Sequence, residues 1–183
     1  MCAKNTDTAN VDTKGYCWYK ATNGIKRHLL VDVLSNVHFV HCTPANVSDD
    51  EGLLAMLKQN QEYFLRLPPE HSLTILLDNG YHLDNGYHKD FLEEQLEQAQ
   101  PLLRKRISIA LADKPTPAQK TASKQSNPAK QGFVVIKQRW VVERANAWIN
   151  QCRVLWKNCE GLLRTSEAKI RICAIRLILR RLA

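Results

Sequence analysis

The chain has 183 residues, of which 44% are hydrophobic and 24% are charged, a composition that suits one compact soluble domain with its own core. Its opening stretch, MCAKNTDTAN, is polar, and no window approaches the roughly 18 apolar residues that a membrane span requires. These features argue against a secreted protein and a membrane protein, so we expect a cytoplasmic one.

The formal net charge of +8 lies entirely in the last quarter of the chain. Residues 137–183 contain 11 Lys and Arg and 3 Asp and Glu, a difference of +8, whereas residues 1–136 contain 15 of each. A basic block of this kind is typical of proteins that bind a polyanion, most often nucleic acid. A solvated basic face without a partner has the same composition and stays open as an alternative.

Neither the cysteines nor the histidines show the spacing of a metal site. The six cysteines include no C-x-x-C pair, which predicts reduced, mostly buried thiols and no zinc site or disulfide framework. His38 and His41 are three residues apart, so on a strand they would point to opposite faces.

The first predicted elements are a β-hairpin and a helix. Lys26–Val33 and Val37–Cys42 flank a short turn and are rich in strand-forming residues, which predicts two antiparallel strands. Ser48 followed by Glu51 fits a capping box, and an apolar helical face then continues to about Leu67, where two prolines end it.

The middle of the chain alternates between strands and helices. Leu73–Leu77 is a short apolar run that predicts a buried strand and places Asp78 at the strand end. A helix is predicted from Asp90 to about Gln98, and a further strand at Ile107–Leu111. Residues 112–132 hold three prolines and four lysines with almost no apolar bulk, which predicts an exposed loop.

Two helices, Gln138–Asn158 and Thr165–Arg181, are predicted to end the chain, the second capped by Thr165 or Ser166. Residues 138–183 would then form a basic helical part of a single domain that spans residues 1–183. The predicted fold class is mixed α and β.

An acidic residue stands out in the first of these helices. The stretch RWVVERANAW places Glu143 between Arg139 and Arg144, and Asp78 is a second carboxylate on a separate element. Carboxylates brought together from separate elements can hold divalent ions for phosphodiester chemistry, and Mg²⁺ (or Mn²⁺) suits such oxygen ligands. A lone Asp at a strand end is also a common structural feature, so these two residues alone leave both interpretations open.

Five stretches in the chain resemble bacterial insertion-sequence transposases of the DDE class: GIKRHLLVD (Gly24–Asp32), TPANVSDDEG (Thr43–Gly52), LLDNGY (Leu76–Tyr81), GFVV with RWVVERANAW (Gly132–Trp148) and IRLILRRLA (Ile175–Ala183). They cover nearly the whole chain in the order of that family. The resemblance implies a ribonuclease-H-like sheet flanked by helices that cuts and rejoins DNA at element ends, with metal ions held by two aspartates and one glutamate.

Carried over residue by residue, the second aspartate of the family falls on Asp78 and the glutamate on Glu143. The first aspartate precedes sequence like that of Lys4–Ala9 in the family, so we expect the first strand to be missing or incomplete and the chain to be N-terminally truncated. A decayed copy and a frame-split element, whose upstream frame supplies the strand, both explain this start. Spacing alone would nominate Asp32, which the resemblance makes structural or substrate-facing.

The hexapeptide LDNGYH occurs twice in succession, at Leu77–His82 and Leu83–His88. The duplication is either a harmless lengthening of a loop or a disturbance of the metal site. Asp84 copies Asp78 but lacks the apolar strand before it, so Asp78 is preferred.

Several cationic residues are candidates for binding DNA phosphates: Lys26, Arg27, His28, Arg139 and Arg144. The first three equally fit an ordinary polar strand edge. Arg139 precedes Glu143 by one helical turn and could orient its carboxylate. Trp140 and Trp148 suit core packing or base stacking.

The predicted function is DNA cleavage and strand transfer on element ends, by a homo-oligomer with no membrane or small-molecule partner, and impaired in this copy. Two alternatives remain: an inactive chain that binds DNA or inhibits the full enzyme, and a metal-dependent nuclease of the same fold.

Overall fold

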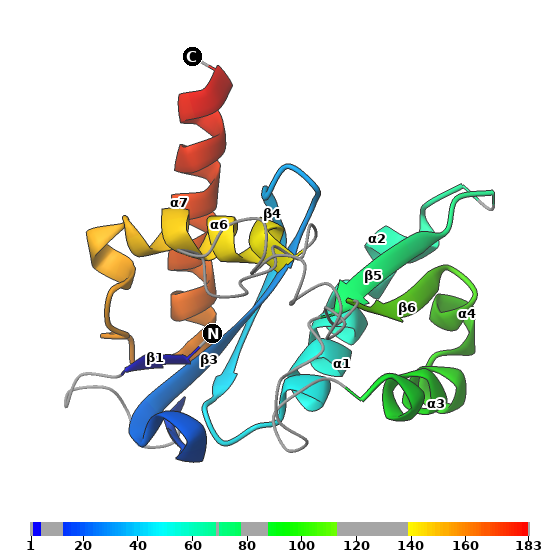
Figure 1. Cartoon of the computed structure of the whole chain (residues 1–183), viewed down its shortest axis with the longest axis horizontal. Helices are drawn as coiled ribbons and strands as arrows, with labels where there is room; N and C mark the ends of the chain where they lie inside the picture. Colours follow the sequence, from blue (N-terminus) through cyan, green and yellow to red (C-terminus); the bar gives the residue numbers. More distant parts are fainter. Residues whose placement is uncertain (1, 5–12, 69, 78–87, 113–138, 183) are drawn as a thin grey trace, which may run out of the picture.

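The computed structural model describes residues 2–4, 13–68, 70–77, 88–112 and 139–182, and it combines two β-sheets with helices (Figure 1). The first sheet is centred on β3 (Thr22–Val31), and the second pairs β5 (Leu73–Leu77) with β6 (Ile107–Leu111). The mixed α and β class predicted from the sequence is confirmed.

In the first sheet, each described pairing involves β3. The short strand β1 (Cys2–Lys4) pairs antiparallel with Gly24–Lys26 on one edge. The other edge of β3 pairs with β2 (Gly15–Cys17) and then with β4 (Val37–Pro44), both antiparallel. The pairing of β3 with β4 confirms the predicted hairpin.

The second sheet is a parallel pair with Leu73 opposite Ile107. Its crossover includes α3 (Lys89–Ala99) and α4 (Pro101–Arg104), as a parallel connection requires a long return path. The carboxyl end of β5 therefore lies beside that of β6.

Described residues cover β5 on one face only. Ile75 and Leu77 are each 5% exposed, whereas Leu76, which points to the opposite face, is 37% exposed. Leu73, at the start of the strand, is also 37% exposed. The prediction of a buried strand is therefore confirmed for Ile75 and Leu77 alone, because the helices packed on this sheet cover the face that carries these two residues.

Two apolar clusters lie on the two sides of the β3–β4 hairpin. One joins β5 and β6 to α1 (Asp49–Gln59) and α2 (Gln61–Leu65), with Leu30 and Phe39 of the hairpin packed against it. The other joins the opposite face of the hairpin to α6 (Arg139–Asn150) and α7 (Leu163–Leu182). Its buried members are Ile25, Val40, Cys42, Ile149, Cys152, Leu155, Ile170 and Cys173.

The helix α7 lies along the free edge of β4 (Figure 1). Glu167 Oε1 accepts a hydrogen bond from the Cys42 backbone N–H at 2.8 Å, and Arg171 donates to the Val40 carbonyl at 3.4 Å. These contacts satisfy backbone groups that an edge strand would otherwise expose.

Three helix boundaries differ from the predictions. The helix after the Ser48–Glu51 capping box, which is present, breaks at Asn60, whose side chain donates to the Met56 carbonyl. The predicted helix to Asn158 ends at Asn150, where the chain turns so that Cys152 and Leu155 enter the core.

The predicted cap of the last helix is also wrong. Ser166 lies inside α7 and is buried, and its hydroxyl donates to Asn158 Oδ1 at 2.6 Å. Thr165 likewise lies inside the helix, which begins at Leu163. The predicted loop at residues 112–132 lies outside the described residues apart from Ala112, and the single-domain organisation stays a prediction.

Candidate active site

Glu143 lies on the exposed side of α6. The helix forms because its apolar residues recur at helical spacing, and Ala145 and Ile149 are buried against the sheet at 1% and 0% exposure. This packing leaves the Glu143 side chain on the exposed side of the helix. Arg139 is the first residue of α6, one turn before Glu143, and its side chain lies outside what the structure describes.

Asp78 and Asp84 lie in the segment of residues 78–87, outside the described residues. The chain leaves β5 at Leu77 and is next described at His88, the last residue of the second LDNGYH copy. Residues that follow a parallel strand stand at its carboxyl end, a usual place for functional side chains.

His88 is anchored to the beginning of α1. The buried Asp50 accepts a hydrogen bond from the His88 backbone N–H at 3.0 Å, and its other carboxylate oxygen lies 2.6 Å from His88 Nδ1. The contact places the start of α3 beside the start of α1. Leu77, the first residue of the first copy, is thus the last residue of β5, and His88, the last residue of the second copy, directly precedes α3.

Asp32 organises the turn between β3 and β4. Its Oδ1 accepts the backbone N–H groups of Leu34 and Asn36, and its Oδ2 accepts from Asn36 Nδ2, at 2.8 to 2.9 Å. Ser35 in this turn has a φ of 68° and is buried. These bonds support the structural interpretation of Asp32 over the catalytic one.

Of the three cationic residues predicted on β3, two are buried and one is partly exposed. Arg27 is 3% exposed and donates to the Leu155 carbonyl, and His28 is 5% exposed with Nε2 at 2.9 Å from Thr43 Oγ1. Lys26 forms an ion pair with Asp49 at 3.1 Å. Neither Arg27 nor His28 can reach a DNA phosphate from these positions.

Burial also changes the chemistry of His28. It lowers the pKa of the His28 imidazole from 6.5 to about 4, because a charged ring would lose its hydration in this position. The ring packs directly against Gly52 of α1, where a Cβ atom would come within 2.1 Å of it. His28 is therefore a neutral core residue at physiological pH.

The tryptophans of α6 alternate with arginines. The guanidinium carbon of Arg144 lies 4.1 Å from the Trp140 ring centroid and 5.0 Å from that of Trp148, and Arg181 of α7 lies 3.9 Å from Trp148. Trp140 is 41% exposed, so the core-packing interpretation is wrong for it. We call Trp140, Arg144, Trp148 and Arg181 the Trp–Arg ladder.

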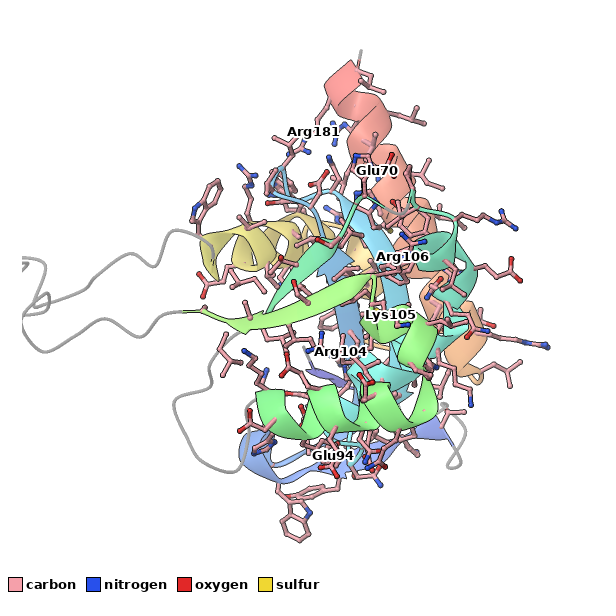
Figure 2. The ribbon with its side chains drawn as sticks, turned by 90° about the vertical axis from the view of Figure 1, so that its right-hand side faces the viewer. Glu70, Glu94, Arg104, Lys105, Arg106 and Arg181 are labelled. Carbon is pink, nitrogen blue, oxygen red and sulfur yellow. The ribbon has the colours of Figure 1, made fainter. Side chains whose placement is uncertain are left out.

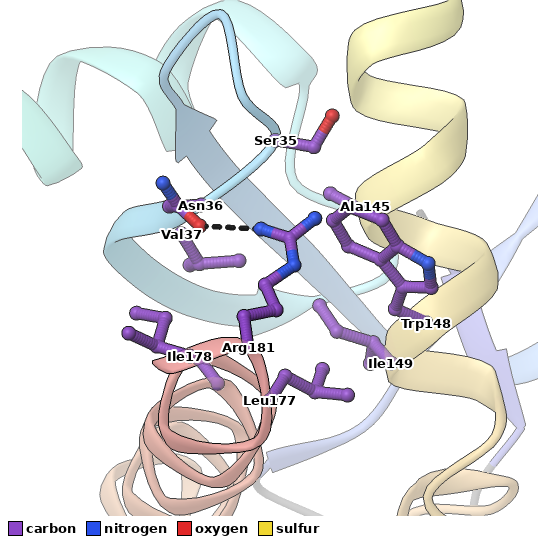
Figure 3. Close-up of a pocket in the computed structure, with 10 residues that line it drawn as sticks. Ser35, Asn36, Val37, Ala145, Trp148, Ile149, Leu177, Ile178 and Arg181 are labelled. Atoms are coloured by element: carbon purple, nitrogen blue, oxygen red, sulfur yellow. Dashed lines mark hydrogen bonds between the residues drawn. The ribbon is translucent and has the colours of Figure 1, made fainter. Parts of the chain in front are cut away.

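The ladder holds the β3–β4 turn. Arg144 Nε donates to Ser35 Oγ at 2.7 Å, and Arg181 Nη1 donates to Asn36 Oδ1 at 2.7 Å. Figure 3 shows Arg181 reaching from α7 between Asn36 and Trp148. Sequence reasoning missed Arg181, Ser35 and Asn36, because these partners lie more than a hundred positions apart along the chain, 109 for Arg144 and Ser35.

The exposed carboxylate of Glu143 is a suitable ligand for a hard divalent cation. Within the described ranges, no group of three or more His, Cys, Asp or Glu side chains gathers as a metal site would require. Asp78, the other carboxylate that the sequence motifs nominate, lies beyond these ranges.

Comparison with known protein families gives a match to the family described as Transposase DDE domain, over residues 6–178. The chain belongs to this family. DDE transposases act on DNA, which they cleave during transposition, they typically use divalent metal ions, and their catalytic domain is ribonuclease-H-like. Comparisons with curated proteins and with solved structures give no match.

Membership in the DDE transposase family confirms the resemblance found in the sequence motifs. The match begins at residue 6 and ends at residue 178, so it includes both Asp78 and Glu143. In the part of the chain that the structure describes, no helix combines the length and apolar content of a bilayer-crossing segment.

Proposed function

We propose that this chain is the catalytic part of an insertion-sequence transposase that cleaves DNA at element ends and transfers the strand, with Asp78 and Glu143 as metal-binding catalytic residues. The observation that carries this proposal is the exposed Glu143 side chain on a helix with basic neighbours, at the position where the motif resemblance implies the glutamate. Mg²⁺ or Mn²⁺ bound there would activate the attacking oxygen and stabilise the leaving oxygen.

We propose further that the site takes its first aspartate from a strand that pairs with Arg27–Val31 on the β1 edge of β3, and that activity is impaired without this strand. The β-sheet supports this. Among the described residues, β1 pairs with β3 only along Gly24–Lys26, and no strand pairs on that edge with Arg27–Val31. An additional strand at this edge would extend the line of β1 along β3. It would lie close to both sheets that contribute to the apolar cluster around β5, β6, α1 and α2.

A strand-transfer assay tests the catalytic proposal. The assay uses the full chain with an added upstream segment that carries the family's Asp-Ser-Gln element, DNA with element ends, and Mg²⁺. Glu143→Gln should lower the rate by roughly a hundredfold or more, because a ligand of the ion is lost. The matched control is Glu97→Gln on the exposed face of α3, which makes the same chemical change far from the site.

Each alternative predicts a different result. An inactive DNA-binding chain would bind DNA but neither cut nor join it, with or without the upstream segment. A nuclease of the same fold would cleave without joining. Equal rates for Glu143→Gln and the unmodified chain would show that the assignment of Glu143 is wrong.

We also propose that two copies act together on cytoplasmic DNA. The support is a stripe on α7 formed by Ile172, Ile175, Leu179 and Leu182, each 56% to 80% exposed and spaced by three or four residues. Apolar residues at this spacing pair helices. Arg176 flanks the stripe, so two copies repel each other until DNA phosphate screens the charge.

Sedimentation equilibrium with and without duplex DNA tests the second copy. The unmodified chain should form a dimer on DNA, and replacing Ile175 and Leu179 with Ser should leave a monomer. Val33→Ser, at a position 81% exposed in the β3–β4 turn, is the control for loss of an exposed apolar side chain. A monomer on DNA for the unmodified chain would contradict the proposal.

A further inference from the structure

The guanidinium groups of Arg144 and Arg181 stack on one indole ring, and neither group has a carboxylate partner among the described residues. Both stack on Trp148, at 5.0 and 3.9 Å. None of the ion pairs between described residues includes either arginine. Their positive charge is therefore available to an anion.

Arg104 on the surface differs in this respect. Arg104 forms an ion pair with Glu93 at 3.1 Å and also donates to the Ile107 carbonyl, so its charge is already compensated. Figure 2 shows Arg104 next to α3, well away from Arg181 on α7. The Trp–Arg ladder is the basic site next to Glu143.

The ladder is held in position before any ligand binds. An arginine has five N–H donors, and the hydrogen bonds to Ser35 and Asn36 use one from each arginine. The remaining donors can form paired bonds with phosphate oxygens, a geometry that guanidinium groups favour. Stacking on Trp148 and the two bonds to the turn limit the motion of both side chains, which reduces the entropy lost on binding.

We propose that Arg144 and Arg181 form a clamp for the phosphate backbone of a DNA strand, fixed by Trp148 and by the β3–β4 turn. Arg144 follows Glu143 in α6, so a strand held here lies at the helix that carries the proposed catalytic carboxylate. The proposal rests on the proposed function for the identity of the ligand. It adds Arg181, the turn and Trp148 to the DNA-binding residues, and it leaves out the buried Arg27 and His28.

Binding of a short labelled DNA duplex to the metal-free full chain, measured by fluorescence anisotropy over a range of salt, tests the clamp. Arg181→Gln should weaken binding about tenfold and lower the slope of log Kd against log salt by about one, as loss of one phosphate contact predicts. Arg180→Gln is the matched control, with the same change of charge at the adjacent position on α7. It should change the affinity less than about twofold.

Asn36→Ala separates the clamp from overall charge, because it frees Arg181 from the turn and leaves the net charge unchanged. Binding should weaken about threefold if the turn preorganises Arg181. This variant and Arg181→Lys keep the test informative if Arg181→Gln does not fold. A lysine retains the positive charge but lacks the planar guanidinium group that stacks on Trp148, so Arg181→Lys should also bind DNA more weakly.

Three results would overturn the clamp: equal losses for Arg180→Gln and Arg181→Gln, unchanged binding by Arg181→Gln, or displacement of DNA by inorganic phosphate at constant ionic strength. The last would indicate a site for a single free phosphate. Because these measurements need no catalysis, loss of strand transfer in Glu143→Gln together with normal binding by Arg181→Gln would reject the clamp and leave the proposed function standing.

Discussion

Arg181 donates a hydrogen bond from Nη1 to Oδ1 of Asn36 at 2.7 Å, although the two residues are 145 positions apart in the chain. The same guanidinium group stacks on Trp148 of α6. The end of α7, the β3–β4 turn and the last turn of α6, the helix that also carries Glu143, therefore meet at one arginine.

Trp148 is the shared surface of this junction, so we expect its replacement to affect stability. Trp148→Leu removes two cation–π contacts and part of a half-buried ring, and should lower the free energy of unfolding by about 1 to 3 kcal/mol. Urea unfolding followed by circular dichroism measures the change. Trp156→Leu is the control, since Trp156 is 69% exposed and stacks on Lys157 alone among the described cations; an equal effect of the two variants would contradict the role of Trp148.

The neutral, buried His28 predicts a dependence of stability on pH. Its pKa is about 4 in the folded protein and near 6.5 when unfolded, so between these values the unfolded chain binds more protons. The contribution to stability is complete above about pH 6.5 and is lost as the pH falls toward 4, by on the order of 3 kcal/mol.

Urea midpoints for the unmodified chain and His28→Gln across this pH window measure the effect. The variant should show a flatter pH dependence, because the group that takes up the proton on unfolding is absent. His71→Gln, an exposed histidine, is the control and should follow the unmodified chain. A slope that persists in His28→Gln would assign the effect to another group.

Glu167 should contribute stability through its charged form. Burial acts to raise its pKa, but hydrogen bonds with His41 and the Cys42 N–H and the charge of Arg171 outweigh burial and lower the pKa below its usual value. A lowered carboxyl pKa stabilises the fold above the unfolded pKa, near 4.3, and this stability is lost as the pH falls through the folded value.

Glu167→Gln should therefore lower the free energy of unfolding at pH 7 by about 1 to 3 kcal/mol, the range for a hydrogen bond to a charged group. The difference from the unmodified chain should shrink as the pH falls through the lowered pKa of Glu167 in the folded protein, because the carboxyl then becomes neutral like the glutamine. Thermal melting at a series of pH values tests this, with the exposed Glu97→Gln as the control. A constant difference at all pH values would show that packing, and not charge, is responsible.

The tandem repeat offers a test of the duplicated segment. Deleting residues 78–83 leaves Leu77 followed by Asp84 to His88, which restores a single LDNGYH and keeps both described anchors, Leu77 in β5 and the His88 contact with Asp50. We expect a folded protein whose free energy of unfolding changes by about 1 kcal/mol or less, since connection length has a small entropic cost.

Denaturant unfolding and strand transfer, measured together on this deletion, separate the two interpretations of the repeat. Increased strand transfer at unchanged stability would show that the duplication disturbs the metal site, and unchanged transfer would show that it is harmless. Asp50→Ala in the deleted chain is the comparison, because it removes the anchor of His88. Failure of the shortened chain to fold would contradict the assumption that Leu77 and His88 keep their positions after the deletion.

Local patterns in the sequence were sufficient for much of the fold. The hairpin of β3 and β4, the strands β5 and β6 and the helix α3 were predicted because strand and helix periodicity is a short-range property. The capping box of Ser48 and Glu51 was also predicted, since its two partners are three residues apart. The family motifs assigned Asp78 and Glu143, which stay proposals as site residues.

Burial and long-range contacts depended on the tertiary structure. Arg27 and His28 look like surface cations on a strand, yet helices from distant parts of the chain cover both faces of that strand and bury them. The end of α6 at Asn150 was missed for a similar reason, because the chain turns there to bury Cys152 and Leu155 against the hairpin.

The sequence by itself determined the family, the periodic elements and the basic character of the last quarter, because motifs, spacing and charge are properties of the linear chain. Only the tertiary structure decided which arginines are buried and which stack together: it buried Arg27, and it brought Arg181 to Arg144 across Trp148. The physical reason is that exposure and stacking depend on which distant segments pack together, which no local spacing records.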